Sequence, residues 1–514
     1  MVVEWNNKFV NMLNQRRFKV TFVSAMIMAV IAHGFAFTNV LHNYDNISVF
    51  MRGYGTGLSS GRWLLTLLGD WVKNTGGGYN TPFFNGILTM LLLSITACII
   101  IDFFEIDSTI LCSLIGAMFL CFPTVTSTMF FMYTAPYYAL AILLAVLAAW
   151  FADRVHFGMV YGSILCAFSL GIYQAYLPLT ASLLILKMLQ NTLSKQRKIE
   201  KFLKEGVYFF LTLVFGVLIY WILLKVCLIT KGISLSDYQG IDQMGKLTIA
   251  EIPYLIKRCY YSFVRLVFSD YCGISQTPLI QKSLMILGLI SIFTNAYLLS
   301  REKWNTNIGE NILLLIVFPI AVNSIILMCP ESNIYTLMVY GTVVIYFVPI
   351  VLLNILKNKK EKLFRYLRIP AVLMIFLSII GYTYQANRNY VALYYTTKQT
   401  ENQLMMLVER ARMADGYKDS QKWAFIGFNV EDELVKNPWE TMEVYGGNAR
   451  YLVNSYARNK FINAYIGFDV PMVEQERIEE LSSLPEIQQM PCYPDDGSIK
   501  VVDDILVIKL ENIQ

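Results

Sequence analysis

The residues best suited to chemistry lie in one polar stretch, residues 39–63, which reads NVLHNYDNISVFMRGYGTGLSSGRW. It brings together one carboxylate, Asp45, one imidazole, His42, and two guanidinium groups, Arg52 and Arg62. A carboxylate can act as a general base, and a guanidinium fork matches the oxygens of a phosphate and stays charged near neutral pH. Four glycines between positions 53 and 61 allow the backbone to fold closely around a ligand. We therefore predict a reacting site here, with Asp45 as its base.

Each of these residues also has an ordinary structural interpretation. The sequence HNYDN around Asp45 is typical of a turn or a helix cap, and only the neighbouring histidine, arginines and tyrosines favour catalysis. An arginine near a membrane boundary, such as Arg52, often extends toward lipid headgroups. Arg62 opens a mostly apolar run, residues 63–72, which is suited to lying along a membrane interface. We therefore expect Arg62 to be the better candidate for binding a phosphate.

A second amphipathic stretch, residues 252–268, carries two further candidates for phosphate binding. Arg258 and Arg265 are seven residues apart and so share one face of a predicted helix. The apolar side is predicted to consist of Leu255, Cys259, Phe263, Leu266 and Val267. Binding lipid headgroups and holding a phosphate are both consistent with this pattern.

Side chains near the predicted outer ends of the spans could bind a sugar or its acceptor. In addition to His42 they are Tyr54, Tyr137, Tyr173 and Gln174. Many tyrosines at such positions belong to the aromatic belt of a membrane protein, so sugar binding is one of two interpretations.

The elements that must position these residues are membrane spans. Of the 514 residues, 56% are hydrophobic and only 15% are charged, whereas soluble domains average about a quarter charged. Apolar runs of about 17 to 22 residues recur, which is the length that crosses a bilayer. The formal net charge of +5 does not indicate nucleic acid, because most basic residues fall in loops that would face the cytoplasm.

We predict about eleven transmembrane helices with the N-terminus in the cytoplasm. They are residues 20–37, 83–101, 109–123, 137–151, 157–173, 177–189, 207–230, 279–299, 312–328, 335–356 and 370–384. The basic clusters at residues 195–204 and 357–368 then face the cytoplasm. The first outer loop covers residues 38–82, and a second large outer loop covers residues 231–278.

The composition changes at about residue 385 to that of a soluble domain. Residues 386–413 have helical spacing, and residues 423–428 (WAFIGF) and 504–510 (DILVIKL) are typical of buried strands. The predicted fold is therefore an all-α polytopic membrane domain, residues 1–384, and a small extracytoplasmic α/β or α+β domain, residues 385–514.

No cofactor or metal site is predicted. The nine cysteines show no CxxC spacing and there are only three histidines, a composition that does not indicate zinc. A divalent cation held weakly by Asp45 and backbone carbonyls stays open, as does a disulfide between Cys259 and Cys272.

Several segments together carry a resemblance to a known family. HNYDN and YGTGLSSGRW in the first loop, TAPYYALAILLA at residues 134–145 and LGIYQAYLPL at residues 170–179 resemble the polytopic glucosyltransferases that modify bacterial O-antigen, the type II-like serotype-converting group. This group belongs to the broader GT-C class. Many relatives carry adjacent acids in the first loop, whereas here Asn46 follows Asp45, which leaves a single base.

The resemblance implies a GT-C-like fold and transfer of a sugar, most simply glucose, from a polyprenyl-phosphate donor. The reaction would take place at the outer face of a bacterial cytoplasmic membrane, with a hydroxyl of a cell-surface polysaccharide as acceptor. Asp45 would remove the acceptor's proton, an arginine would stabilise the departing phosphate, and the anomeric centre would invert. The implied partners are the lipid-linked sugar, the acceptor glycan and membrane lipids.

Two other classes of protein fit the same spans. A flippase or permease for a lipid-linked glycan precursor would explain eleven helices without chemistry, but few ionisable residues lie within the spans, where coupled transport usually needs them. A carrier also has no need of an outer soluble domain. A scaffold for cell-wall assembly predicts that single substitutions in the first loop have no effect on glycosylation.

Overall fold

The chain forms two compact units, each mostly helical. The computed structural model describes residues 15–48, 57–76, 81–194, 198–237, 248, 250–301, 308–427 and 455–512. The first unit consists of Met1–Thr38 and Arg52–Arg388, and the second consists of Asn39–Met51 and Asn389–Gln514. The predicted first outer loop, residues 38–82, therefore contributes residues to both units.

Eight helices of the described chain are long and apolar enough to cross a membrane. They are α2 (Arg16–Thr38), α5 (Pro82–Phe103), α6 (Thr109–Cys121) with α7 (Pro123–Phe130), α8 (Ala135–Arg154), α11 (Ile199–Lys231), α13 (Pro278–Arg301), the 3₁₀ helix η5 (Tyr340–Val343) with α16 (Val344–Asn358), and α17 (Leu363–Arg412). Three shorter helices, α9 (Gly158–Ile172), α10 (Leu177–Ser194) and α14 (Ile308–Val322), overlap the remaining predicted spans. The chain is thus a multi-pass membrane protein in which every predicted span overlaps a helix.

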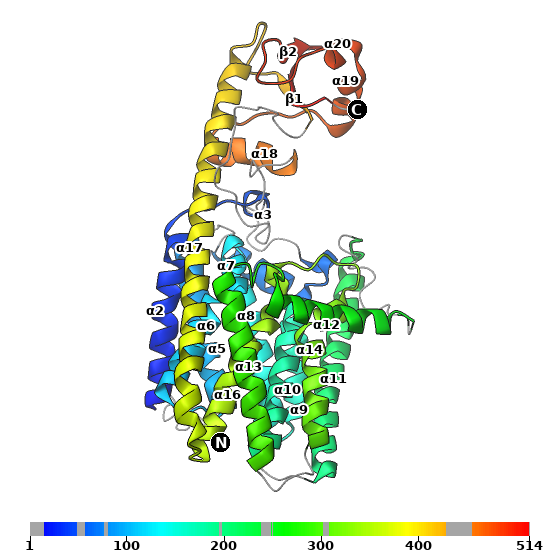
Figure 1. Cartoon of the computed structure of the whole chain (residues 1–514). Coiled ribbons are helices and arrows are strands. Elements are labelled where there is room, and N and C mark those ends of the chain that lie inside the picture. The colour runs from blue at the N-terminus through cyan, green and yellow to red at the C-terminus, as the bar shows by residue number, and fades with distance from the viewer. Residues whose placement is uncertain are drawn as a thin grey trace. The chain divides into compact units, whose positions relative to one another are not determined.

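Close packing holds the helices of the first unit, which run side by side in Figure 1. A Cβ on Gly116 of α6 would lie 2.7 Å from the carbonyl oxygen of Thr21 on α2, so only glycine allows this approach. Ser169 Oγ on α9 donates a 2.8 Å hydrogen bond to the Ala141 carbonyl on α8. Small residues and interhelical hydrogen bonds of this kind stabilise helix pairs in lipid, where apolar side chains gain little by leaving the solvent.

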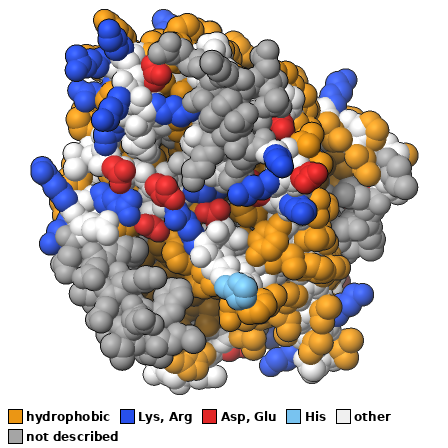
Figure 2. All heavy atoms as spheres, turned by 90° about the horizontal axis from the view of Figure 1, so that it is seen from below, with side chains coloured by type: hydrophobic (Ala, Val, Ile, Leu, Met, Phe, Trp, Pro, Cys, Tyr) orange, Lys and Arg blue, Asp and Glu red, His pale blue; other side chains and the backbone are white. Residues whose placement is uncertain are grey.

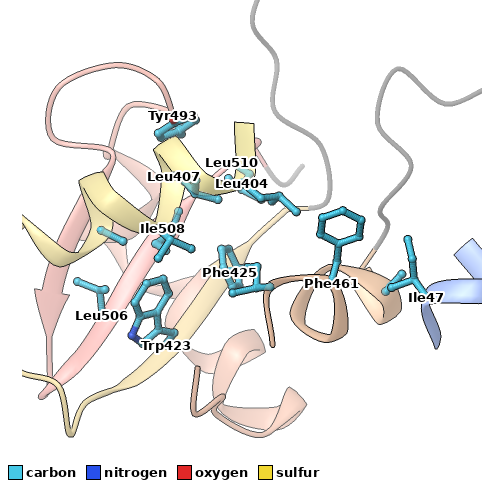
Figure 3. Packing of buried hydrophobic residues seen from close by; sticks show 14 residues of the cluster. Ile47, Leu404, Leu407, Trp423, Phe425, Phe461, Tyr493, Leu506, Ile508 and Leu510 are labelled. Atoms are coloured by element: carbon cyan, nitrogen blue, oxygen red, sulfur yellow. The ribbon is translucent and has the colours of Figure 1, made fainter. Parts of the chain in front are cut away.

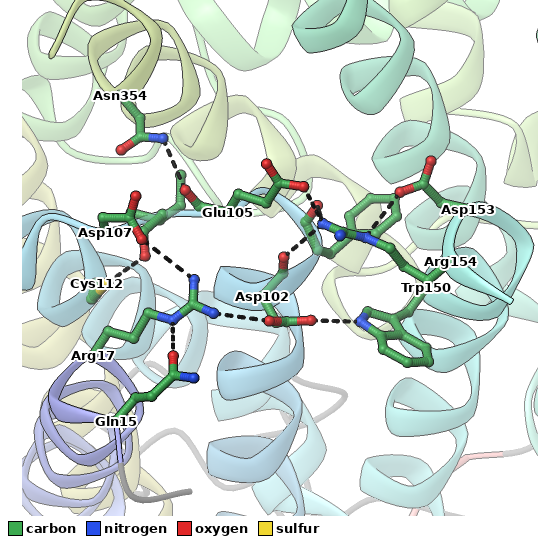
Figure 4. A network of polar contacts seen from close by, with 12 residues as sticks. Gln15, Arg17, Asp102, Glu105, Asp107, Cys112, Trp150, Asp153, Arg154 and Asn354 are labelled. Atoms are coloured by element: carbon green, nitrogen blue, oxygen red, sulfur yellow. Dashed lines mark hydrogen bonds and ion pairs between the residues drawn. The ribbon is translucent and has the colours of Figure 1, made fainter. Parts of the chain in front are cut away.

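One end of the bundle is joined by a network of charged side chains (Figure 4). Asp102 at the end of α5 accepts hydrogen bonds from Arg17 Nη2 of α2 (3.1 Å) and Trp150 Nε1 of α8 (2.9 Å). Arg154 Nη2 pairs with a carboxylate oxygen of Glu105 at 2.6 Å. These two acids therefore connect the ends of α2, α5 and α8.

The ends of α10 and α16 lie at this same end of the bundle. Asn354 Nδ2 donates to the Glu105 carbonyl (3.1 Å), and Lys359 Nζ donates to the Leu193 carbonyl (3.0 Å). Figure 2 views the molecule from below and shows Lys and Arg side chains interspersed with Asp and Glu among hydrophobic surface. Lys and Arg side chains at one end of a bundle are the feature that the positive-inside rule uses to predict the cytoplasmic end.

The predicted amphipathic helix at residues 252–268 is confirmed as α12 (Ile252–Phe268). Its buried side chains are Leu255, Cys259, Ser262 and Leu266, while Phe263 and Val267 are half-buried. Its exposed side chains include Tyr254, Tyr261, Val264 and Phe268. The helix therefore packs on the protein with the predicted side and presents an aromatic surface on the other.

A three-stranded sheet organises the second unit. Strand β1 (Lys422–Ile426) runs parallel to β3 (Ile505–Lys509), and β2 (Ile499–Val502) pairs antiparallel with β3, in the order β1-β3-β2. The predicted strands at residues 423–428 and 504–510 are thus confirmed, and β2 is an additional strand. Among the residues that the structure describes, the unit also contains the helices α18 (Ser455–Phe461), α19 (Gln475–Ser483) and α20 (Pro485–Gln488).

Successive side chains along a strand point to opposite faces of the sheet, and each face packs in a hydrophobic cluster of its own. On one face, Trp423 and Phe425 pack in a cluster with Leu404 and Leu407 of α17 (Figure 3). The cluster on the other face contains Ala424, Ile426, Val507, Leu481, Ile487 and Met490. Burial on both faces explains why these strands are nearly continuous hydrophobic runs.

The predicted last span and the predicted helix that follows it form one continuous helix, α17. Residues 382–412 contain neither proline nor glycine, so nothing in the sequence interrupts the helix at the predicted boundary near residue 385. Its first part belongs to the first unit and its last part to the second.

Candidate active site

A tight backbone turn presents Arg62. The 3₁₀ helix η1 (Leu58–Ser60) ends at Gly61, whose φ of 75° lies in the left-handed region that glycine adopts without steric strain. The Arg62 N–H donates to the Gly57 carbonyl (3.2 Å), and α4 (Trp63–Gly76) begins at the next residue. The arginine therefore stands at the start of the apolar run, as the sequence predicts.

Two tyrosines orient the Arg62 guanidinium. Its Nη1 donates to the Tyr138 hydroxyl (3.2 Å), and its Cζ lies 4.9 Å from the centroid of the Tyr173 ring. The rings of Tyr138 and Tyr173 are stacked, with centroids 4.6 Å apart and planes 13° from parallel. A cation over an aromatic ring gains about 0.5–2 kcal/mol, with the larger values where water is excluded, and Arg62 is half-buried. The direction of the guanidinium fork is thus set by protein contacts.

Gln174 and Tyr220 hold the backbone that precedes Arg62. Gln174 Nε2 donates to the Ser60 carbonyl (2.8 Å) and to the Tyr220 hydroxyl (3.0 Å). The Tyr220 hydroxyl donates in turn to the Gly61 carbonyl (3.1 Å). Because both side chains are buried and engaged with this turn, their contacts favour a positioning role for Gln174 over the predicted contact with sugar.

The two predicted sugar-binding tyrosines of the first unit differ in their surroundings. Tyr173 is buried and also meets Tyr176 edge-on, with ring centroids 5.3 Å apart. Tyr137, near the start of α8, is half-buried. Tyr173 therefore takes part in a tyrosine cluster around Arg62, and Tyr137 is the more accessible of the two.

Asp45 lies on a one-turn helix, α3 (Tyr44–Ser48), which belongs to the second unit. Asn43 precedes this helix as a cap, since its Oδ1 accepts the Asn46 N–H (2.7 Å) and its carbonyl accepts the Ile47 N–H (3.2 Å). The Asp45 side chain is exposed in the first turn of the helix. A carboxylate at this position is stabilised by the helix N-terminus and is accessible to an acceptor molecule.

His42 is buried among aromatic rings of the second unit. Its ring centroid lies 4.1 Å from that of Tyr465 and 5.4 Å from that of Phe461. Burial, and to a smaller extent the positive charge of Lys398, lowers the pKa of His42 from 6.5 to about 4, so the imidazole is neutral near pH 7. These contacts favour packing over the predicted contact with sugar or acceptor.

The remaining predicted arginines have distinct environments. On α12, Arg258 is half-buried and its Nη1 donates to the Pro330 carbonyl (2.6 Å), whereas Arg265 is exposed. Arg52 and the predicted sugar ligand Tyr54 lie outside the described residues. Of the four predicted phosphate ligands, Arg62 is therefore the one held within a tyrosine cluster in the described part of the chain.

Sequence analysis did not single out Asp270 or Tyr220, and it grouped Tyr138 with the other tyrosines at the outer ends of the spans. Asp270 follows α12 and is half-buried, and its carboxylate accepts the N–H groups of Gly273 (3.3 Å) and Ser275 (3.2 Å). Burial raises the pKa of Asp270, an effect that these two hydrogen bonds oppose. Its place in an outer loop directly after an amphipathic helix was the available signal.

The disulfide left open by the sequence does not form. Cys259 and Cys272 are free thiols whose sulfur atoms donate to the carbonyls of Asn323 (3.6 Å) and Ile334 (3.3 Å) respectively. Within the described ranges, no group of three or more His, Cys, Asp and Glu side chains is arranged to hold a metal ion.

The region that contains these residues matches a protein-family model described as "Glucosyl transferase GtrII", over residues 34–346. The match covers more than half of the 514 residues, begins within α2, includes Asp45 and Arg62, and ends within α16. The chain belongs to the glucosyl transferase GtrII family. The resemblance found in the first loop and the later spans is thereby confirmed, and membership of this family makes the chain an enzyme of glucosyl transfer. No curated protein and no solved structure matches the chain.

Proposed function

We propose that this member of the GtrII family transfers a glucose-type hexose from a polyprenyl-phosphate donor to a hydroxyl of a cell-surface polysaccharide, at the outer face of the membrane. The family supplies glucosyl transfer as the reaction class. The observation that carries the choice of a phosphate-linked donor is the Arg62 guanidinium, oriented by Tyr138 and Tyr173 within a membrane-spanning unit.

The proposed reaction is a single displacement at the anomeric carbon. The acceptor oxygen forms a bond to that carbon while the bond from the carbon to the phosphate oxygen breaks, which inverts the anomeric configuration. Asp45 takes the proton of the acceptor hydroxyl, and the electron pair of the broken bond leaves with the polyprenyl phosphate. A phosphate is a good leaving group, so the mechanism needs a base but no general acid.

The surroundings of Arg62 support its role with the leaving phosphate. Negative charge builds on the phosphate oxygens as the bond breaks, and a cation that is already oriented stabilises this charge with little reorganisation. The guanidinium is held by a hydrogen bond and by an aromatic ring, and the turn before it is held by Gln174 and Tyr220.

The surroundings of Asp45 support its role as base. Its carboxylate is exposed on a capped turn, whereas the adjacent Asn46 is buried. An exposed carboxylate can reach a proton on a bulky glycan, which a buried group could not. The proposed mechanism therefore uses one acid from this loop.

The distribution of charge supports an extracytoplasmic site. Arg17, Arg154 and the basic residues 357–368 belong to one end of the bundle, which the positive-inside rule assigns to the cytoplasm. The segment that carries Asp45 follows the other end of α2 and folds with residues 389–514 in one unit. The two parts of that unit must lie on the same side of the membrane, and we propose that this side is the outside.

Purified full-length enzyme, glucosyl polyprenyl phosphate and acceptor polysaccharide provide the test. We expect Asp45→Asn to lower kcat by about 10²–10⁴, because it retains the shape of the side chain and removes the base. Asp237→Asn is the matched control, since it removes an exposed carboxylate from the second predicted outer loop and should leave kcat unchanged. A nucleotide-linked glucose should not replace the lipid-linked donor.

The outcomes separate the parts of the proposal. Full activity of Asp45→Asn would discard Asp45 as base while keeping the donor and acceptor classes. Transfer from the nucleotide sugar would discard the lipid donor. Absence of transfer with any lipid-linked sugar, together with movement of that lipid across a vesicle bilayer, would favour the flippase alternative.

A further inference from the structure

The turn that carries Asp45 is part of the hydrophobic core of the C-terminal unit. Ile47, two residues after Asp45, is fully buried and belongs to the same cluster as Leu404 and Leu407 of α17 and Phe461 of α18. Figure 3 shows Ile47 beside Phe461, with the strand residue Phe425 farther along the same cluster. A residue of the first loop thus packs in a core that is otherwise built from the end of the chain.

His42 gives the turn a second attachment to the same region. Its ring packs against Phe461 of α18 and Tyr465 of the following π-helical segment, η7 (Ile462–Ile466). Its Nδ1 has no hydrogen-bond partner in the part of the chain that the structure describes, and the ring is 2% exposed. His42 therefore attaches the turn through ring packing, on the other side of Asp45 from Ile47.

Local hydrogen bonds make the segment between these attachments a compact turn. The Asn43 side chain accepts from the Asn46 backbone, and Asn46 Nδ2 donates to the Leu41 carbonyl (3.2 Å). His42, Asn43, Asn46 and Ile47 are all buried, and the Asp45 side chain is exposed among them. The carboxylate thus projects from a turn whose neighbouring residues are fixed.

We propose that the C-terminal unit positions the catalytic base, with Phe461 as the positioning residue that contacts the Asp45 turn on both sides of the carboxylate. This inference rests on the proposed role of Asp45. It gives residues 455–466 a part in catalysis although they lie outside the matched region of the family, residues 34–346. Displacement of a catalytic base by about 1 Å can lower the rate of the reaction by about 10²-fold, so the residues that hold the Asp45 turn affect kcat.

Two substitutions of buried side chains in the full-length enzyme separate positioning from general stability. Phe461→Ala removes the ring that contacts His42 and packs with Ile47. Met490→Ala is the control, because Met490 is also buried in the unit but lies in the cluster on the opposite face of the sheet. Both variants are assayed for kcat and KM, and amide hydrogen exchange is measured at residues 41–48.

We expect Phe461→Ala to lower kcat by about 10–10²-fold with an unchanged KM for the donor, and to accelerate exchange at residues 41–48. Met490→Ala should leave both quantities near those of the wild type. Phe461→Leu, which restores much of the buried volume, should recover most of kcat and of the protection. If Phe461→Ala does not fold, Ile47→Ala replaces it, because it removes the other partner of the same packing and should likewise lower kcat and accelerate exchange relative to Met490→Ala.

Two results would overturn the inference. One is wild-type kcat in Phe461→Ala despite faster exchange at residues 41–48, and the other is unchanged exchange in that variant. Failure of the proposed function is recognised separately, because Asp45→Asn would then be active. In that case the exchange data alone decide whether α18 holds the turn.

Discussion

The Oδ1 atom of Asn43 accepts a 2.7 Å hydrogen bond from the backbone N–H of Asn46. This bond closes the turn on which Asp45 stands. The surroundings of the Asn46 side chain explain why the turn has no second acid. Asn46 is 1% exposed and its Nδ2 donates to the Leu41 carbonyl. A carboxylate at position 46 would be buried facing a carbonyl oxygen, so this turn accommodates one acid, at position 45.

Loss of the Asn43 cap should loosen the turn. We expect Asn43→Ala to destabilise α3 by about 1 kcal/mol, since the acceptor for the Asn46 N–H is removed. Amide exchange at residues 44–48 should then be about fivefold faster than in the wild type. Asn43→Ser keeps an acceptor oxygen without adding a buried charge and should retain protection. Identical exchange in Asn43→Ala and the wild type would show that the cap contributes nothing.

Replacement of Arg62 tests the role of the guanidinium fork. Arg62→Lys keeps the charge but loses the planar fork and its fit over Tyr173, so we expect kcat to fall by about 10–10²-fold. Arg62→Ala also removes the charge and should lower kcat by about 10²–10³-fold. Lys282→Ala, which removes an exposed positive charge at the start of α13, is the control and should have wild-type kcat. Wild-type kcat in Arg62→Ala would exclude this arginine from the reaction.

The helices were predictable because their signals are local. An apolar run of span length, a basic loop or an amphipathic repeat is complete within about thirty residues, and α12 begins and ends at the predicted residues. The two strands of the C-terminal unit were predictable for the same reason, since each is a short run of buried residues. The continuity of α17 was not predicted because the composition changes near residue 385, where the two units divide, although no helix breaker accompanies the change.

The contacts of the candidate site were not predictable because they join distant parts of the chain. Gln174 and Ser60 are 114 residues apart, and the choice of Tyr138 over Tyr137 as the partner of Arg62 depends on the rotation of α8. His42 is a candidate by its residue type and its place in the first loop, yet its surroundings are formed by Phe461 and Tyr465 at the other end of the chain. A single sequence contains the residue types but not these pairings.

The buried imidazole of His42 makes the second unit sensitive to acid. Its pKa is about 4 in the folded chain against 6.5 when unperturbed, so the folded state resists protonation. The contribution of His42 to the free energy of unfolding is therefore fully present above pH 6.5. It declines as the pH falls from 6.5 toward 4, because the unfolded state binds the proton first. Over this range the loss amounts to about 3 kcal/mol. Thermal unfolding of the second unit between pH 7.5 and 4.5 measures it.

Two histidine variants assign this acid sensitivity to a residue. His42→Phe retains an aromatic ring without a titrating group, so its unfolding should depend less on pH than that of the wild type. His156→Gln removes an exposed histidine and should keep the wild-type dependence. The same pH dependence in His42→Phe as in the wild type would assign the effect to other groups.

At the predicted cytoplasmic end of the bundle, Asp102 and Glu105 should differ in their contributions to stability. Asp102 is 21% exposed and accepts from both Arg17 and Trp150, so Asp102→Ala leaves two donors of neighbouring helices without this acceptor. We expect a loss of about 2 kcal/mol. Glu105 is 62% exposed and its ion pair with Arg154 is screened by water, so Glu105→Ala should cost less than about 1 kcal/mol. Thermal unfolding of the two variants in detergent provides the comparison, and the double variant Arg17→Ala/Asp102→Ala isolates the pair. Equal losses in the two single variants would contradict the conclusion that burial and a second donor make Asp102 the principal acid of this network.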